Sequence, residues 1–157
     1  MSERANELAR RLDEANAELA RAIEACSDAT WKSPCPEEGW PIGVTAHHVA
    51  ATIPEVMDFV QLIAAGQPLP PMTRDIIDQG NAEHARAAAG CTKADALQLL
   101  RENGAMASRE LRGFGDEQLD RKGQLFVGEM SAQAVIEAAL IGHVAGHLQS
   151  IRSAAPA

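Results

Sequence analysis

Apolar side chains recur at helical spacing over most of the chain, and this pattern constrains the fold more than any other feature. Between residues 2 and 29 one stripe carries Leu8, Leu12, Ala15, Leu19, Ile23 and Cys26, with charged residues opposite. Alanine is the dominant apolar residue, tyrosine is absent, and no segment alternates long enough to predict a sheet. The pattern therefore predicts an all-α protein whose helices pack closely through small side chains.

Turn and capping residues set the limits of the predicted helices. We expect helices over 2–29 with Ser2 as N-cap, 41–65 ended by Gly66, 73–89 ended by Gly90, 92–113 opened by a Thr92–Asp95 capping box, and 131–153 capped by Ser131. Pro54 predicts a kink or a lost hydrogen bond inside the second helix. Residues 67–71 form a Pro-rich crossover, and residues 113–130 are expected to be mainly loop. Together they predict a four-helix bundle with long crossover connections, formed by residues 1–157 as a single domain.

The charge of the chain argues against two classes of partner. Its net charge is −8 and aromatic residues make up 3% of it, so neither a basic patch nor a base-stacking platform for nucleic acid is expected. No apolar stretch approaches the length of a membrane span, and the first residues lack a signal-peptide core. We therefore expect a cytoplasmic protein that binds neither nucleic acid nor membrane.

Three cysteines are present, and their spacing does not predict disulfides. Cys26, Cys35 and Cys91 form neither a C-x-x-C pair nor an even set, which fits a reducing compartment. Cys26 falls on the apolar stripe of the first helix and is expected to be a buried structural thiol. Cys35 lies in a Pro- and Gly-containing loop, where we expect it to be exposed and without a catalytic role.

Two histidines four residues apart, His143 and His147, are the strongest chemical signal in the chain. On a helix this spacing places both imidazoles on the same face, where they can bind one divalent metal. Both share a stripe with apolar residues of the last helix and therefore point into the bundle. His48 borders the apolar side of the helix over 41–65, whereas the adjacent His47 is predicted to face water.

Three inward histidines on two helices suggest a shared ligand. Each imidazole buried separately needs its own hydrogen-bond partners, whereas one metal satisfies a nitrogen of all three. The alternative is that each is an ordinary core histidine with local partners. A three-histidine site leaves positions open for water or substrate. Valine follows His143 where a zincin has its glutamate, and no Glu-x-x-His occurs, which excludes a ferritin-like di-iron site.

Two further polar residues are candidates for contact with substrate. Asn81 and His84 align with Ile77 and Ala88 on the inner face of the helix over 73–89. We expect them to line the same cavity as the three histidines. The alternative for His84 is a histidine at the edge of the surface.

These motifs resemble the DinB/YfiT superfamily of metal-binding four-helix bundles. The resemblance rests on Gly39-Trp40 followed by His48, the Pro-containing crossover, the segment Phe114–Asp120, and His143-x-x-x-His147. The resemblance spans nearly the whole chain. In that family the corresponding histidines form the metal triad, which here implies His48, His143 and His147.

The resemblance also implies a range of chemistry. Related proteins include mycothiol-dependent maleylpyruvate isomerase and transferases that use mycothiol, bacillithiol or glutathione. The resemblance thus implies a metal-dependent thiol transferase or isomerase that acts on a small electrophile and forms a homodimer. Zinc and nickel both suit imidazole ligands, and the spacing does not choose between them. A metal held by three neutral imidazoles keeps its full charge and an open face for a small thiol. The alternatives are a metal-dependent hydrolase and a non-catalytic, metal-stabilised binding or dimerisation module.

Overall fold

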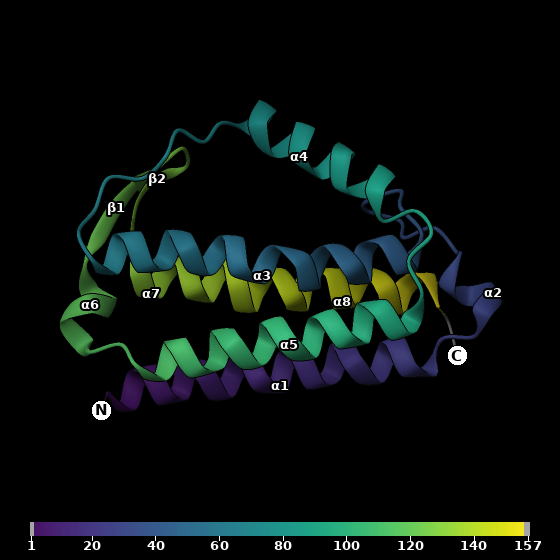
Figure 1. Cartoon of the computed structure of the whole chain (residues 1–157), viewed down its shortest axis with the longest axis horizontal. Helices are drawn as coiled ribbons and strands as arrows, with labels where there is room; N and C mark the ends of the chain where they lie inside the picture. Colours follow the sequence, from purple (N-terminus) through teal and green to yellow (C-terminus); the bar gives the residue numbers. More distant parts are fainter. Residues whose placement is uncertain (1, 156–157) are drawn as a thin grey trace.

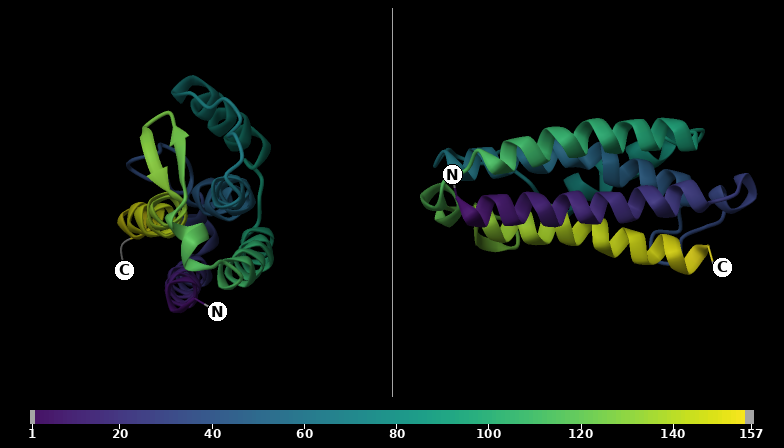
Figure 2. Two further views of the ribbon diagram at one scale, coloured as in Figure 1. Left: turned by 90° about the vertical axis from the view of Figure 1, so that its left-hand side faces the viewer. Right: turned by 90° about the horizontal axis from the view of Figure 1, so that it is seen from below.

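Four long helices lie side by side in the computed structural model, which describes residues 2–155 (Figure 1). They are α1 (Glu3–Ala25), α3 (Ile42–Ala64), α5 (Lys93–Arg112) and a continuous C-terminal helix. The C-terminal helix consists of α7 (Ala132–Val135), a π-helical stretch η1 (Ile136–Ile141) and α8 (Gly142–Ala154). Seen along the bundle, these helices occupy four corners, as Figure 2 shows. The predicted four-helix bundle is confirmed.

The helices α3 and α5 run in the same direction, and this determines the main connection (Figure 1). Two parallel helices can be joined only by a segment that returns along the whole bundle. Residues 65–92 do so, and they contain α4 (Arg74–Ala87). α4 lies outside the four-helix core, packs on α3 and has no buried residue. The predicted long crossover is therefore present.

The core lies between the apolar stripes that the sequence predicts. Its largest fully buried side chains include Leu12, Leu19 and Ile23 of α1, Ile53, Met57 and Ile63 of α3, Leu111 of α5, and Ile136, Leu140 and Ile151 of the C-terminal helix. Burial of each such side chain contributes about 1.5–3 kcal/mol to folding. This packing fixes how far α3 and the C-terminal helix are shifted along each other.

Four of the predicted caps and stop residues are present at helix ends. The Ser2 hydroxyl accepts the Ala5 backbone N–H, and the Ser131 hydroxyl accepts that of Ala134. Thr92 and Asp95 form the predicted capping box. Gly66 follows α3 with φ of 68°, a left-handed conformation that favours glycine.

Three local predictions were wrong. The helix over 2–29 stops at Ala25, because the Ser27 hydroxyl accepts the Thr30 N–H and starts a separate turn, α2 (Asp28–Trp31). The expected loop over 113–130 contains α6 (Asp116–Asp120) and an antiparallel hairpin, β1 (Lys122–Leu125) and β2 (Gly128–Ser131). The hairpin strands are too short for an alternating pattern to stand out.

The third error concerns Cys35, which is 1% exposed rather than on the surface. A bridge between Pro34 and Pro41 closes the loop over it, and its backbone N–H donates to the Trp40 carbonyl at 2.7 Å. Pro54 is accommodated within α3, which continues through it with one N–H donor fewer.

The C-terminal helix is apolar enough to meet a simple criterion for membrane spans. Among residues 2–155, Ala132–Ala154 is the one helix whose length and mean hydropathy do so, although the sequence suggested none. In the structure one side of this helix packs against α1 and α3 in the bundle.

Gly43 offers a test of this packing. A Cβ there would lie 2.6 Å from Cε2 and Nε1 of Trp31, whose Nε1–H donates to the Cys91 carbonyl at 3.0 Å. Because the ring cannot retreat without losing that bond, Gly43→Ala should lower the free energy of unfolding by about 1–3 kcal/mol. Urea denaturation measures this. Gly80→Ala on α4, where nothing lies within 4 Å, should be neutral or slightly stabilising; equal stability of both variants would contradict the packing.

Candidate metal centre

Three imidazoles converge from α3 and α8 on the side of α3 on which α4 packs. His48 lies on α3 and is 5% exposed, and His143 and His147 lie on successive turns of α8. The Nε2 atom of His143 is 3.2 Å from Nε2 of His48 and 3.0 Å from Nε2 of His147. One nitrogen of each ring lies within 4.8 Å of the other two. The structure thus brings together the three residues that the sequence singled out.

The spacing of these nitrogens suits a shared cation better than a hydrogen-bond network. His143 Nε2 faces two other nitrogens, and it cannot donate to one while accepting from the other. A metal with tetrahedral bonds of about 2.0–2.1 Å holds its ligand nitrogens about 3.3 Å apart. The observed separations are close to that value. The residues present therefore fit a divalent ion, with three neutral nitrogens as ligands.

Glu38 supports the triad from a loop, and sequence analysis missed it. Its Oε1 lies 2.6 Å from Nδ1 of His147, and Ser150 Oγ donates to Oε2 at 2.6 Å. When the proton is on Nδ1, Nε2 of His147 carries a lone pair that faces the other two imidazoles. This carboxylate–histidine contact is the usual second contact of a metal-binding histidine. It fixes both the tautomer and the orientation of the ring.

The position of Glu38 depends on a turn after α2. The Gly39 N–H donates to the Cys35 carbonyl at 2.9 Å, and Gly39 has φ of 71°, which glycine adopts without strain. The Pro34–Pro41 bridge holds the two ends of the turn together. An acidic residue directly before Gly39-Trp40 is the only signal in the sequence, and it does not reveal a partner 109 residues away.

His47 does not face open water, contrary to the sequence prediction. It is half-buried, and its Nδ1 lies 3.2 Å from Nε2 of His84 on α4. The α3 periodicity places His47 away from the bundle core correctly, but the crossover covers that side. The His84 ring is 5.6 Å from the His48 ring, and Trp40 packs edge-on to His48 at 5.3 Å. All five histidines of the chain therefore lie in one cluster.

Asn81 lies one turn before His84 on the same half-buried face of α4. This agrees with the alignment predicted from the sequence. Its contact with a substrate stays a prediction.

The electrostatics of the cluster keep His48 and His143 neutral. Burial, together with the neighbouring imidazoles, lowers the pKa of His48 to about 3, and burial and His147 lower that of His143 to about 4. Burial alone would raise the pKa of Glu38, but the hydrogen bonds from Ser150 and His147 hold it below its ordinary value. A negative charge thus lies directly behind a set of neutral nitrogens, which suits cation binding.

None of the three cysteines belongs to the group of potential metal ligands. Burial raises the pKa of Cys26, Cys35 and Cys91, so each remains a thiol at neutral pH. Any nucleophilic sulfur at the three-histidine cluster must come from another molecule.

Replacement of Glu38 should weaken metal binding without abolishing it. Glu38→Gln keeps the shape of the side chain but removes the charge that holds Nδ1–H of His147, so the dissociation constant should rise about 10–100-fold. Competition with a chromophoric chelator measures it. Glu37→Gln, at an exposed neighbouring carboxylate, is the matched control. Unchanged affinity in both variants would show that Glu38 does not orient the ligand.

The depressed histidine pKa values predict how the metal-free protein responds to acid. Below about pH 6.5 the unfolded chain takes up protons at His48 and His143, whereas the folded chain does not until about pH 4 or 3. Stability should therefore fall as pH drops through this window, by about 1.4 kcal/mol per pH unit for each histidine. Urea denaturation at several pH values measures the slope. His48→Asn should make the dependence of stability on pH shallower. An unchanged slope would show that the lowered pKa of His48 does not contribute to it.

A profile of the DinB superfamily matches residues 11–151 of the chain. A sequence comparison with curated proteins gave no match.

Solved structures with the same fold were found, all with low sequence identity. YfiT from Bacillus subtilis, described as a probable metal-dependent hydrolase with an unusual four-helix bundle topology, is 18% identical, with a TM-score of 0.79 over 98% of this chain and 87% of that one. A mycothiol-dependent maleylpyruvate isomerase is 13% identical, with a TM-score of 0.75 over 96% of this chain and 63% of that one. The sibling lethal factor precursor DfsB is 15% identical, with a TM-score of 0.69 over 98% and 95% of the two chains.

Proposed function

Because this chain belongs to the DinB superfamily, we propose that its three-histidine cluster is the metal centre of a thiol-dependent enzyme. The reaction is an S-transfer to a small electrophile or an isomerisation that uses a small thiol. The fold shared with a mycothiol-dependent isomerase supports this class of reaction.

The observation that carries the proposal is the composition of the cluster. Among the residues that the structure describes, the group of potential ligands consists of three histidines and no carboxylate. A divalent ion bound there would retain its full positive charge and would lower the pKa of a small thiol. Glu38 is held by His147 and Ser150, so its carboxylate is not free to act as a general base toward water. This arrangement favours a thiol, which ionises more readily than water, as the nucleophile.

The protein residues around the cluster would bind and orient the two reactants. His84 and Asn81 on α4, together with His47, offer hydrogen-bonding groups on the side opposite to α8. Burial and the nearby His47 lower the pKa of His84, so it is neutral at pH 7 and can donate or accept one hydrogen bond. Trp40 closes one side of the cluster next to His48.

The proposed metal is zinc or nickel, since both bind imidazole well. The candidate thiols are mycothiol, bacillithiol and glutathione. None of the described residues distinguishes among them, so the test must include all three.

A metal-dependent hydrolase is the second candidate, because the same fold is found in YfiT, which is described in those terms. In a hydrolase a water molecule would replace the thiol. It would need a proton acceptor, for which His84 is better placed than the engaged Glu38.

The proposal predicts metal-dependent conjugation with at least one thiol. Zinc- or nickel-loaded protein should conjugate mycothiol, bacillithiol, glutathione or coenzyme A to monochlorobimane faster than metal-free protein does, as followed by fluorescence. His48→Ala should lose both the metal and the conjugation. His47→Ala should retain stoichiometric metal by elemental analysis, because His47 contacts His84 and not the triad. Equal rates for loaded and metal-free protein with every thiol would exclude the transferase and favour the hydrolase.

A further inference from the structure

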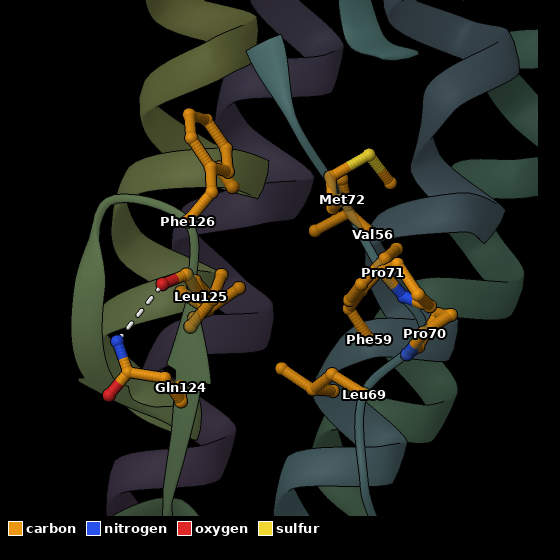
Figure 3. A pocket seen from close by; sticks show the side chains of 11 residues that line it. Val56, Phe59, Leu69, Pro70, Pro71, Met72, Gln124, Leu125 and Phe126 are labelled. Atoms are coloured by element: carbon orange, nitrogen blue, oxygen red, sulfur yellow. Dashed lines mark hydrogen bonds between the residues drawn. The ribbon is translucent and has the colours of Figure 1, made fainter.

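An apolar pocket of about 370 Å³ lies between α3, the crossover, the hairpin and the C-terminal helix (Figure 3). Its walls include Val56 and Phe59 of α3, Met72 of the crossover, Phe126 at the hairpin turn, and Val135 and Ala139 of the C-terminal helix. No charged side chain lines it. Its polar residue, Gln124, donates its amide N–H to the Leu125 carbonyl at 3.1 Å. Its volume and lining are those of a small-molecule site.

The hairpin keeps this pocket open. At its base the backbone lies directly on α3: a Cβ at Gly123 would be 2.8 Å from Cγ1 of Ile63 and 3.3 Å from Cδ1 of Leu69. Phe126 at the turn is 47% exposed, although it borders an apolar cavity. A hairpin that is tightly seated at its base thus leaves a large apolar side chain incompletely covered at its tip. A ligand in the pocket would cover it and gain apolar contact.

The pocket and the histidine cluster lie along the same two helices. Ala139 precedes His143 by four residues, about 6 Å along the helix, and Phe59 follows His48 by eleven residues, or about three turns. In a regular α-helix, residues eight apart drift by about 80°, but the π-helical stretch η1 holds more residues per turn and offsets this drift. Val135, Ala139 and His143 therefore lie on one side of the C-terminal helix.

The space between the pocket and the cluster is bordered by small or half-exposed residues. Ala139 and Gly142 are exposed, and Thr52 is half-exposed. The Thr52 hydroxyl donates to the carbonyls of His48 and Val49 in its own helix, so it offers no unpaired donor here. α4 passes over this stretch with its half-buried face toward α3 (Figure 1). A molecule could thus extend from the cluster to the pocket under α4.

We propose that the pocket binds the apolar tail of an elongated substrate whose polar head lies at the three-histidine cluster. This rests on the proposed function for the head, and it adds the substrate class: an amphipathic small molecule with an aliphatic chain or an aromatic ring at one end. The uncharged lining gives a second charged group no partner in the pocket. The polar chemistry is therefore confined to the cluster.

The test uses alkyl hydroxamates, whose head binds metals and whose tail can be lengthened. Acetohydroxamate, hexanohydroxamate and decanohydroxamate are titrated into the cobalt-substituted protein, and the cobalt spectrum reports on the head. Each methylene that enters the pocket should tighten binding about threefold to fourfold. Val56→Asp places a charge in the pocket and should remove this gain. Val127 follows Phe126, is 63% exposed and does not line the pocket, so Val127→Asp should retain the gain in affinity.

A second readout does not depend on metal. The neutral fluorescent dye N-phenyl-1-naphthylamine should bind the metal-free protein, should be displaced by decanohydroxamate but not by acetohydroxamate, and should fail to bind Val56→Asp. Circular dichroism and light scattering establish that this variant is folded and unchanged in oligomeric state.

The outcomes separate the two proposals. If acetohydroxamate binds but longer tails add nothing, the pocket inference is wrong and the metal-centre proposal stands. The dye could bind in a Val56-dependent manner while no hydroxamate alters the cobalt spectrum. The bound metal would then have no coordination position open to a ligand, and both the metal-centre proposal and the link between pocket and cluster would be wrong. A change of oligomeric state in Val56→Asp but not in Val127→Asp would instead make the pocket an interface between copies of the chain.

Discussion

The packing of α3 against the C-terminal helix is the constraint on which the rest of the site depends. His48 and His143 are 95 residues apart, and their nitrogens meet at 3.2 Å only when these helices are in the observed register. Core side chains such as Ile53 and Leu140 set that register, because a closely packed interior does not allow the helices to slide continuously. The relative positions of the histidines therefore depend on core residues elsewhere in the same helices.

Polar and apolar side chains gather at different positions along α3 and the C-terminal helix. At one end the polar side chains gather, with Glu38 behind His147 and with His47 and His84 opposite. At the other end the lining carries no charged group. The π-helical stretch, a feature that often marks functional sites, lies between Val135 and His143 and brings these two residues onto one side of the helix. Proposed chemistry and proposed recognition thus occupy different turns of the same helices.

Sequence reasoning succeeded where the determinants are local or periodic. Ser2, Thr92 and Ser131 cap helices because their hydroxyls bond to backbone groups a few residues away, and the apolar stripes need only the 3.6-residue repeat. It missed some local features, such as the turn at Ser27 and the short hairpin, and it failed at residues whose partners come from a distant segment. His47 was predicted to face water because the phase of α3 contains no information about α4. Glu38 was missed because its partners, His147 and Ser150, lie on α8, far away in the sequence. The π-helical stretch was also missed, since no distinctive residue pattern announces it.

The crossover that carries α4 has a further consequence for how this protein can change over generations. None of the residues of α4 is buried, so its side chains contribute little to the stability of the bundle, yet its inner face covers the site. Mutations there escape the strong selection that maintains a packed core. New specificities can therefore arise on α4 while the four helices and their histidines are inherited intact.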